Sequence, residues 1–265
     1  MENGQPSRTA WSAARYRAAH QILETGSIFR DPLAVRILNE PQADLLADAP
    51  RRAMRLFIAA RTRFAEDAIA AAVTRGVREL VILGAGLDTY AYRNPHPRLR
   101  VTEVDHPDTQ AWKRKRLAEA GIEVPEGVRY AGVDFEKESL TVDLDGPAFF
   151  LWLGVVPYLT SEGFGETLAF VASAEGNEVA FDYAQSPERM APDRRAALEA
   201  RAERVARIGE PWLTYFEPDE IAAELRSRGF AAIEDLGPSE LAARYFGRPD
   251  VPPETAGGHV LHARR

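Results

Sequence analysis

Short apolar runs alternate with amphipathic stretches along most of the chain. The apolar runs are typical of strands buried on both faces of a parallel sheet, whereas apolar positions three and four residues apart are typical of helices. The predicted strands span residues 80–83, 99–104, 128–133, 148–153, 179–183, 231–235 and 259–263. The predicted helices span 9–24, 32–38, 50–75, 107–120, a stretch from 161, 218–228 and 239–245. This alternation predicts an α/β protein with a doubly wound sheet.

A glycine turn follows the first predicted strand, which ends in Gly84-Ala85-Gly86. Glycine allows positive φ and leaves no side chain between the main chain and a ligand. The second strand ends in two acids, Glu103 and Asp105, and Asp105 lies 21 positions after Gly84. A carboxylate about 20 residues after such a turn typically receives ribose hydroxyls. The pattern predicts a nucleotide site, and a tight turn without a ligand is the alternative.

The residues after the turn favour an adenosine ligand without phosphate. A dinucleotide fingerprint has a third Gly or an Ala where this chain has Thr89. Asp88 also places a negative charge where a helix is expected to begin, whereas a pyrophosphate requires positive potential there. S-adenosylmethionine therefore fits better than NAD or NADP, and a nicotinamide-dependent dehydrogenase is disfavoured.

Two further features are candidates for binding the two ends of such a ligand. Asp134-Phe135 ends the third strand, where the carboxylate could accept from the adenine amine and the ring could cover the base; Asp134 could instead cap a turn. Arg61 lies on the apolar stripe of the helix at 50–75. A guanidinium buried there requires an anion, which could be the carboxylate of the methionine half of the cofactor or a protein acid. Alternatively, the Arg61 side chain could reach the edge of the stripe and stay in water.

Composition narrows the classes of function. The chain has 40 acidic and 33 basic residues, a net charge of −7 and no cysteine, which disfavours nucleic acid as a partner and excludes disulfides and thiolate metal sites. His259 and His262 are expected on opposite faces of a strand, so no metal site is predicted. No apolar run is long enough for a membrane span, and we expect a cytoplasmic protein. The basic run at 113–116 is interpreted as a solvated helix face.

Several motifs together resemble the leucine carboxyl methyltransferase-like family of class I S-adenosylmethionine-dependent methyltransferases. They are IFRDPLA, GAGLDTYAYR, EVDHP with the following KRKRL, VDFE and WLGVVPYLT, in the order of the family and over nearly the whole chain. The resemblance implies a seven-stranded, mostly parallel sheet with an antiparallel last strand and a helical cap. The long charged segment after the fifth strand is then an insertion. We expect an N-terminal cap at 1–75, a cofactor-binding core at 76–185, the insertion completing the cap at 186–228, and the rest of the sheet at 229–265.

The resemblance also assigns roles to residues. Arg61 matches the arginine on the methionine carboxylate, Asp105 the ribose acid, and Asp134 with Phe135 the adenine pair. One departure is Leu153, which stands where many members have a Glu after the strand Trp, so the methionine amino group is left to backbone carbonyls such as those of Gly84 or Gly154. The expected cofactor-binding residues are Arg61, Gly84, Ala85, Gly86, Asp88, Glu103, Asp105, Asp134, Phe135 and Gly154.

The predicted reaction is O-methylation of a small molecule, with a carboxylate as the preferred acceptor. A carboxylic acid with a pKa of about 4 is ionised at neutral pH, whereas a phenol with a pKa of about 10 needs a base. Neither His20 nor His106 belongs to a pair that would serve as that base. Tyr158, which matches a family tyrosine near the acceptor, is the candidate catalytic residue that orients the carboxylate; a half-buried structural aromatic is the alternative. A phenolic or carbon acceptor, and a non-catalytic cofactor-binding protein, remain open.

Overall fold

A seven-stranded sheet forms the centre of the protein in a computed structural model, which describes residues 7–47, 52–135, 137–138, 140–207, 209–252 and 255–265. The strands are β1 (Glu79–Leu83), β2 (Arg100–Asp105), β3 (Val128–Gly132), β4 (Ala148–Trp152), β5 (Glu178–Ala184), β6 (Ala232–Leu236) and β7 (Gly258–Arg264). Their order in the sheet is β3-β2-β1-β4-β5-β7-β6. Strands β1 to β5 are parallel, and β7 is antiparallel to both β5 and β6. The predicted fold class is confirmed, including the antiparallel last strand.

The strand order reverses at β1, whose neighbours are β2 on one side and β4 on the other. Leu83 lies beside Val104 of β2, and Ile82 lies beside Leu151 of β4, so the strands end close together at one edge. In open α/β sheets, ligands bind outside the carboxyl ends of the strands at such a reversal. All residues of β1, β4 and β5 are buried, which explains their nearly continuous apolar runs.

The helices are α1 (Arg8–Leu23), α2 (Ala34–Leu38), α3 (Gln42–Ala47), α4 (Arg52–Thr74), α5 (Pro107–Glu119), α6 (Ser161–Val171), α7 (Pro192–Ala206), α8 (Pro218–Ser227) and α9 (Pro238–Tyr245). Short 3₁₀ helices are η1 (Tyr90–Tyr92), η2 (Val156–Tyr158) and η3 (Pro187–Arg189). Helix α3 was not predicted. The predicted helix start at Pro50 lies outside the described residues.

The prediction of an α-helix directly after the glycine turn was wrong, because the chain forms only the short 3₁₀ helix η1 there. The Asp88 side chain accepts a hydrogen bond from the Tyr90 main-chain N–H at 2.7 Å and closes this turn. Pro95 follows shortly afterwards, and proline disfavours a helical conformation in the residue before it. Asp88 therefore does not lie at the N-terminus of an α-helix, and the expectation that it opposes a helix dipole at this position was wrong.

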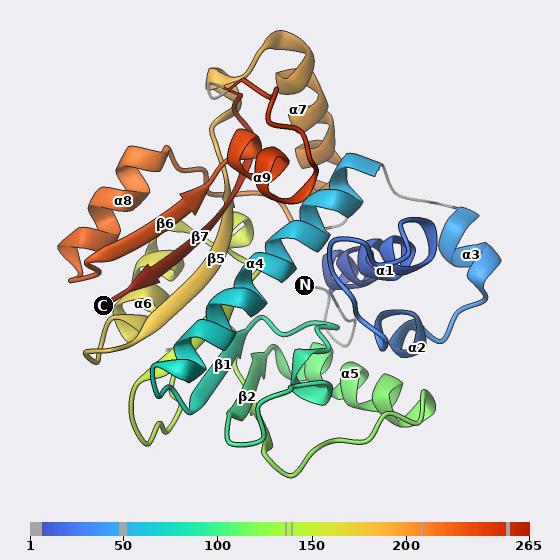
Figure 1. Ribbon diagram of the computed structural model, residues 1–265, viewed down its shortest axis with the longest axis vertical. Helices are drawn as coiled ribbons and strands as arrows, with labels where there is room; N and C mark the ends of the chain where they lie inside the picture. The colour runs from blue at the N-terminus through green and yellow to red at the C-terminus, as the bar shows by residue number, and fades with distance from the viewer. Residues whose placement is uncertain (1–6, 48–51, 136, 139, 208, 253–254) are drawn as a thin grey trace.

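Helices cover both faces of the sheet. In Figure 1, α4 crosses the front of the sheet and α6 lies behind it. One core cluster joins α6 and α8 to the side chains of Val81 and Phe150, and the other joins α4 to those of Ile82 and Phe149. Adjacent residues of β1 thus face opposite cores, as strand alternation requires. Trp152, at the end of β4, stacks on Phe164 of α6 with ring centroids 5.5 Å apart.

Helices α1, α2 and α3 form a group beside the N-terminal half of α4 (Figure 1). Their apolar side chains pack with Leu87, just after the glycine turn, and with Leu117 of α5. The division of the chain into cap and core at the boundaries given above stays a prediction. Within the described residues, no helix combines the length and the apolar composition needed to span a bilayer. The cytoplasmic location also stays a prediction.

Candidate cofactor and acceptor site

A cavity of about 1,100 Å³ lies at the carboxyl ends of β1 to β4. Its volume is slightly above the range of about 300–1,000 Å³ that is typical of ligand pockets. Its walls come from the sheet edge, from α1 and α4, and from the segment that follows β5. The predicted site residues that line it are Arg61, Gly84, Ala85, Gly86, Asp88, Asp105, Asp134, Phe135, Gly154 and Tyr158.

The glycine turn has the positive φ angles that its sequence predicts, +63° at Gly84 and +44° at Gly86. A Cβ at Gly84 would collide with the Val155 side chain, and a Cβ at Gly86 would lie 2.9 Å from the Cβ of Ala10 in α1. The glycines are therefore required by packing as well as by conformation. The turn lies between β4 and α1, and its main chain borders the cavity.

The Asp105 carboxylate supports this turn. One oxygen accepts from the Gly86 N–H at 2.5 Å and the other from the His106 N–H at 2.7 Å. Burial raises the pKa of Asp105, although these two N–H groups act in the opposite direction. The carboxylate thus fixes the shape of the turn while bordering the cavity, where it could still accept from ribose hydroxyls.

Glu103 is not placed to bind a ligand in the cavity, which corrects the sequence-based assignment. Glu103 lies two residues before Asp105 in β2 and therefore further from the sheet edge. Its carboxylate accepts from Lys113 at 2.7 Å and from the Tyr92 hydroxyl at 2.8 Å. Burial raises the pKa of Glu103. Lys113 is only 1% exposed, so the basic run is not entirely a solvated face. Strand alternation alone could not distinguish Glu103 from Asp105, because both side chains lie on the same face.

Asp134 and Phe135 lie together at the end of β3, as predicted. The Asp134 carboxylate pairs with Lys137 at 2.8 Å and lies 3.8 Å from the Nε2 atom of His106. The Asp134 carbonyl also accepts from the N–H groups of Lys137 and Glu138 and begins a turn. Asp134 thus starts a turn and also borders the cavity, and its contact with adenine stays a prediction.

Arg61 pairs with a protein acid that the sequence analysis missed. Its Nη1 atom lies 2.5 Å from a carboxylate oxygen of Asp182, whose other oxygen accepts from the Gly154 N–H at 2.5 Å. Arg61 is 9% exposed and Asp182 is 5% exposed. The available signal was an acid in the middle of the apolar strand EVAFDYA, where a buried charge requires a partner.

The Arg61 guanidinium also borders the cavity beside Gly154, and its Nε atom is buried without a hydrogen-bond partner among the described residues. Asp182 occupies one side of the guanidinium, and guanidinium groups have donors for a second anion. The donor set at this end of the cavity therefore fits the methionine carboxylate of S-adenosylmethionine.

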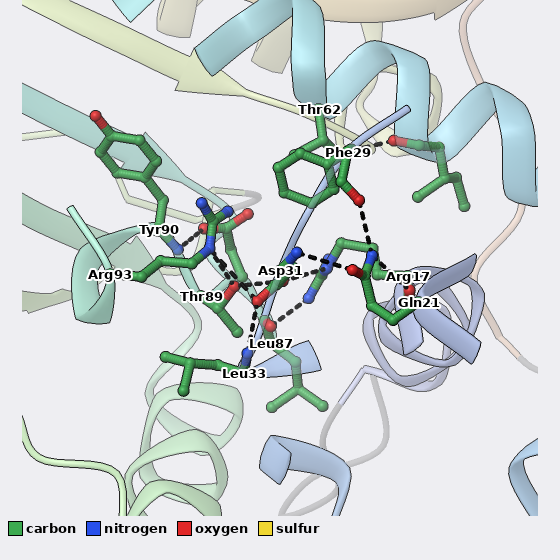
Figure 2. Close-up of polar contacts among 12 residues, drawn as sticks. Arg17, Gln21, Phe29, Asp31, Leu33, Thr62, Leu87, Thr89, Tyr90 and Arg93 are labelled. Atoms are coloured by element: carbon green, nitrogen blue, oxygen red, sulfur yellow. Dashed lines mark hydrogen bonds and ion pairs between the residues drawn. The ribbon is translucent and has the colours of Figure 1, made fainter. Parts of the chain in front are cut away.

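A cluster of buried polar side chains connects α1 to the glycine turn (Figure 2). Arg17 of α1 donates to the Leu87 carbonyl, and its guanidinium lies 3.8 Å from Asp31. Asp31 accepts from the Thr89 hydroxyl at 2.6 Å. The side chain at position 89 thus has a structural partner, because its hydroxyl joins the turn to the segment before α2.

The Asp31 carboxylate also contacts the segment that leads into α2 and a second arginine. It accepts from the Leu33 N–H at 3.0 Å, is 1% exposed and lies 3.4 Å from the guanidinium of Arg93. Arg93 in turn pairs with Glu66 of α4. The cluster thus joins α1, α4 and the turn through charged side chains, which sequence spacing could not reveal because the partners are far apart in the chain.

Tyr158 of η2 borders the cavity and packs edge-on against Trp212 with ring centroids 6.5 Å apart. Leu153, at the position of the family Glu, also lines the cavity. The surrounding lining is largely apolar and includes Met54, Met190, Leu198, Val205 and Leu213. Within the described part of the chain, no group of three or more His, Asp or Glu side chains is placed to hold a metal ion.

The sheet order, the glycine turn at the strand-order reversal and the acids bordering one cavity define a class I S-adenosylmethionine-dependent methyltransferase. A model of the leucine carboxyl methyltransferase family matches residues 10–172, and the chain belongs to this family. The resemblance inferred from the sequence motifs, the class of enzyme and the cofactor are thereby confirmed.

Relatives are similar over long stretches. A protein of Bacillus subtilis strain 168, named "Putative S-adenosyl-L-methionine-dependent methyltransferase YktD", is 29% identical over 301 residues, covering 99% of each chain. A protein of Mycolicibacterium gilvum strain PYR-GCK with the same general name is 33% identical over 214 residues, covering 76% of this chain and 69% of the relative.

Two solved structures share the fold at low sequence identity. A DUF574 family protein of Streptomyces avermitilis MA-4680 has a TM-score of 0.57 and 16% identity, covering 96% of this chain and 97% of that one. Magnesium protoporphyrin IX methyltransferase of Synechocystis PCC 6803, with bound S-adenosylhomocysteine, has a TM-score of 0.52 and 11% identity, covering 96% and 99%.

Proposed function

We propose that the protein transfers the methyl group of S-adenosylmethionine to a carboxylate of a small molecule and forms a methyl ester. The observation that carries this proposal is the charge of the cavity lining. Arg17, Arg61 and Lys137 each have a carboxylate partner. Arg8 of α1 and Arg204 of α7 also line the cavity, and neither has an ion-pair partner among the described residues. An uncompensated cation attracts an anionic acceptor.

The cofactor would lie along the sheet edge. Asp134 and Phe135 would hold the adenine, Asp105 the ribose, and Arg61 the methionine carboxylate, with the glycine turn beneath the chain of the cofactor. When bound, S-adenosylmethionine supplies an electrophilic methyl group. This placement leaves the part of the cavity beside α7 and η2 for the acceptor, whose apolar body would meet Met190, Leu198 and Leu213.

The arrangement of bases also favours an acceptor that is already ionised. His106 lies beside Asp134 at the adenine end, and its Nδ1 atom accepts from the Asp108 N–H at 3.2 Å. Glu210 lines the cavity near α7, but its two oxygens accept from main-chain N–H groups. A carboxylate with a pKa of about 4 needs no base at neutral pH. Holding the reactants in line could then supply about 7–11 kcal/mol of the barrier reduction.

Labelled cofactor and a panel of apolar carboxylic acids, phenols and carbon acids would test the proposal. The expected product is a methyl ester that mild alkali hydrolyses. Arg204→Gln should raise the KM for acids, whereas the matched Arg207→Gln, which removes an exposed partner of Glu203 on the same segment, should not. An alkali-stable product would replace the carboxylate by a phenol or a carbon acceptor. Tight cofactor binding with no product from any acceptor would favour the non-catalytic alternative.

A further inference from the structure

Helix α1 forms one wall of the cavity directly above the glycine turn. Its first residues, Arg8, Thr9 and Ala10, line the cavity, and Ala10 packs against Gly86. A ligand at the turn is therefore enclosed between α1 and the sheet edge. The middle of the helix is held by the buried Arg17–Asp31 cluster. The N-terminal end also contacts α5, where the Ser7 N–H lies 3.4 Å from the Thr109 hydroxyl and Trp11 packs against Trp112, and it is the end that must move if the ligand is to leave the turn.

The N-terminal end of α1 is held by a residue about 200 positions away in the chain. One oxygen of Glu210 accepts from the Arg8 N–H at 3.0 Å, and the other accepts from the Thr9 N–H at 3.1 Å. The Ser7 hydroxyl lies 3.4 Å from the same carboxylate. The first N–H groups of a helix have no partner within the helix, and a negative charge at that end is favourable.

Glu210 itself belongs to a segment fixed at the sheet edge. Leu213 donates its N–H to the Pro157 carbonyl at 2.7 Å, and the Thr214 hydroxyl donates to the Leu159 carbonyl. Pro157 belongs to η2, which follows β4 and carries Tyr158. The contact between Glu210 and α1 therefore connects the cofactor side of the cavity to the acceptor side.

We infer that Glu210 is a positioning residue that holds α1 closed over the bound cofactor and limits the exchange of S-adenosylmethionine and S-adenosylhomocysteine. Its side chain is only partly buried, in contrast to Asp31, so this contact can open while the buried cluster stays intact. Opening moves the N-terminal turn of α1 away from Gly86 and exposes the ligand. The inference depends on the cofactor site and not on the identity of the acceptor.

The test is the dissociation rate of S-adenosylhomocysteine. Stopped-flow displacement measures this rate through tryptophan fluorescence, to which Trp11 and Trp212, on the two sides of the contact, both contribute. Glu210→Gln keeps one acceptor oxygen without the charge and should accelerate dissociation several-fold. Glu210→Ala removes both main-chain hydrogen bonds and should accelerate dissociation at least about tenfold, the factor that corresponds to loss of one charge-assisted hydrogen bond. The melting temperature and the on-rate should change less than the off-rate.

Glu203→Gln is the matched control, because Glu203 lies on α7 and pairs only with exposed Arg207 among the described residues. Its exchange rate should equal that of the wild type. If Glu210→Ala folds normally and releases S-adenosylhomocysteine at the wild-type rate, the inference is wrong. Because no acceptor is present in this experiment, its outcome is independent of the proposed carboxylate chemistry.

A cross-link gives a second test that keeps Glu210 in place. The chain has no cysteine, so Thr9→Cys with Pro211→Cys provides two unique thiols. Joining them with a short, cleavable bis-maleimide should slow cofactor exchange at least tenfold, and cleavage of the linker should restore the rate of the unlinked protein. Exchange at the same rate in the linked and cleaved forms would overturn the inference.

Discussion

The floor and the roof of the cavity are built by different kinds of contact. The floor is the sheet edge, where Asp105 bonds to the Gly86 N–H and Asp134 begins a turn directly after its own strand. The roof is α1 with the segment after β5, held by side chains that meet across long stretches of sequence, such as Asp31 with Thr89 and Glu210 with α1. We propose that the floor recognises the cofactor, and that the roof holds the cofactor in place and shapes the acceptor space.

The largest effect is expected at the buried ion pair between α4 and β5. The apolar stripe alone would allow Met in place of Arg61, but the structure places buried Asp182 beside it. Arg61→Met should therefore lower the free energy of unfolding by about 3–5 kcal/mol, because it leaves an uncompensated buried charge. Urea unfolding measures this loss, and cofactor affinity should fall as well.

Adding Asp182→Asn to Arg61→Met should recover most of the lost stability but not the cofactor affinity. Arg63→Met is the control, since Arg63 forms an exposed pair with Asp67 that should contribute no more than about 1 kcal/mol. A fully stable Arg61→Met protein would mean that the pair with Asp182 does not persist in solution.

A second effect is expected where the roof joins the floor. Asp31→Asn keeps the side-chain shape but removes the charge that faces Arg17 and Arg93. The free energy of unfolding should fall by about 1.5–3 kcal/mol, the range for hydrogen bonds to charged groups. A double-mutant cycle with Thr89→Val should show coupling of at least about 0.5 kcal/mol. Additive effects would show that the two residues act separately.

The floor was predictable from the sequence and the roof was not. Gly84 follows β1, Asp105 is the last residue of β2 and Asp134 lies just after β3, so period and spacing placed them at one sheet edge. Glu103 was misassigned because alternation gives the face of a strand and not the depth from its edge. The partners of Arg61, Asp31 and α1 come from remote segments, and a single sequence carries only the indirect signal of a charge in an apolar pattern.

At the floor, Asp105→Ala should weaken binding of S-adenosylhomocysteine by about ten- to a hundredfold, since it removes the charge-assisted hydrogen bond expected to the ribose. Calorimetry measures this change. Glu103→Gln is the most informative control, because Glu103 pairs with Lys113 beneath the cavity. This substitution should change the stability of the protein more than its affinity for the cofactor. NAD binding more tightly than S-adenosylhomocysteine would contradict the cofactor assignment.

Acidification should reproduce part of the Asp105→Ala effect. Burial raises the pKa of Asp105 above its ordinary value of 3.8, so protonation of the free protein begins at a higher pH than for an exposed aspartate. The protonated carboxyl loses the charge that ribose hydroxyls require, so affinity should fall as the pH falls through this raised pKa. The affinity ratio of wild type to Asp105→Asn should therefore decrease towards one at low pH, whereas a constant ratio would exclude Asp105 as the titrating group.

The smallest effect is expected at Tyr158, where η2 meets the acceptor side. Tyr158→Phe keeps the ring that packs against Trp212 and removes only the hydroxyl. If that hydroxyl orients the acceptor carboxylate, the KM for acids should rise by about two- to tenfold, which corresponds to one hydrogen bond of about 0.5–1.5 kcal/mol. Cofactor affinity and unfolding free energy should change less than the KM, because the ring that packs against Trp212 stays in place. An unchanged KM in Tyr158→Phe, together with a loss of stability in Tyr158→Leu, would assign Tyr158 to packing and leave Arg204 as the group that recognises the acceptor.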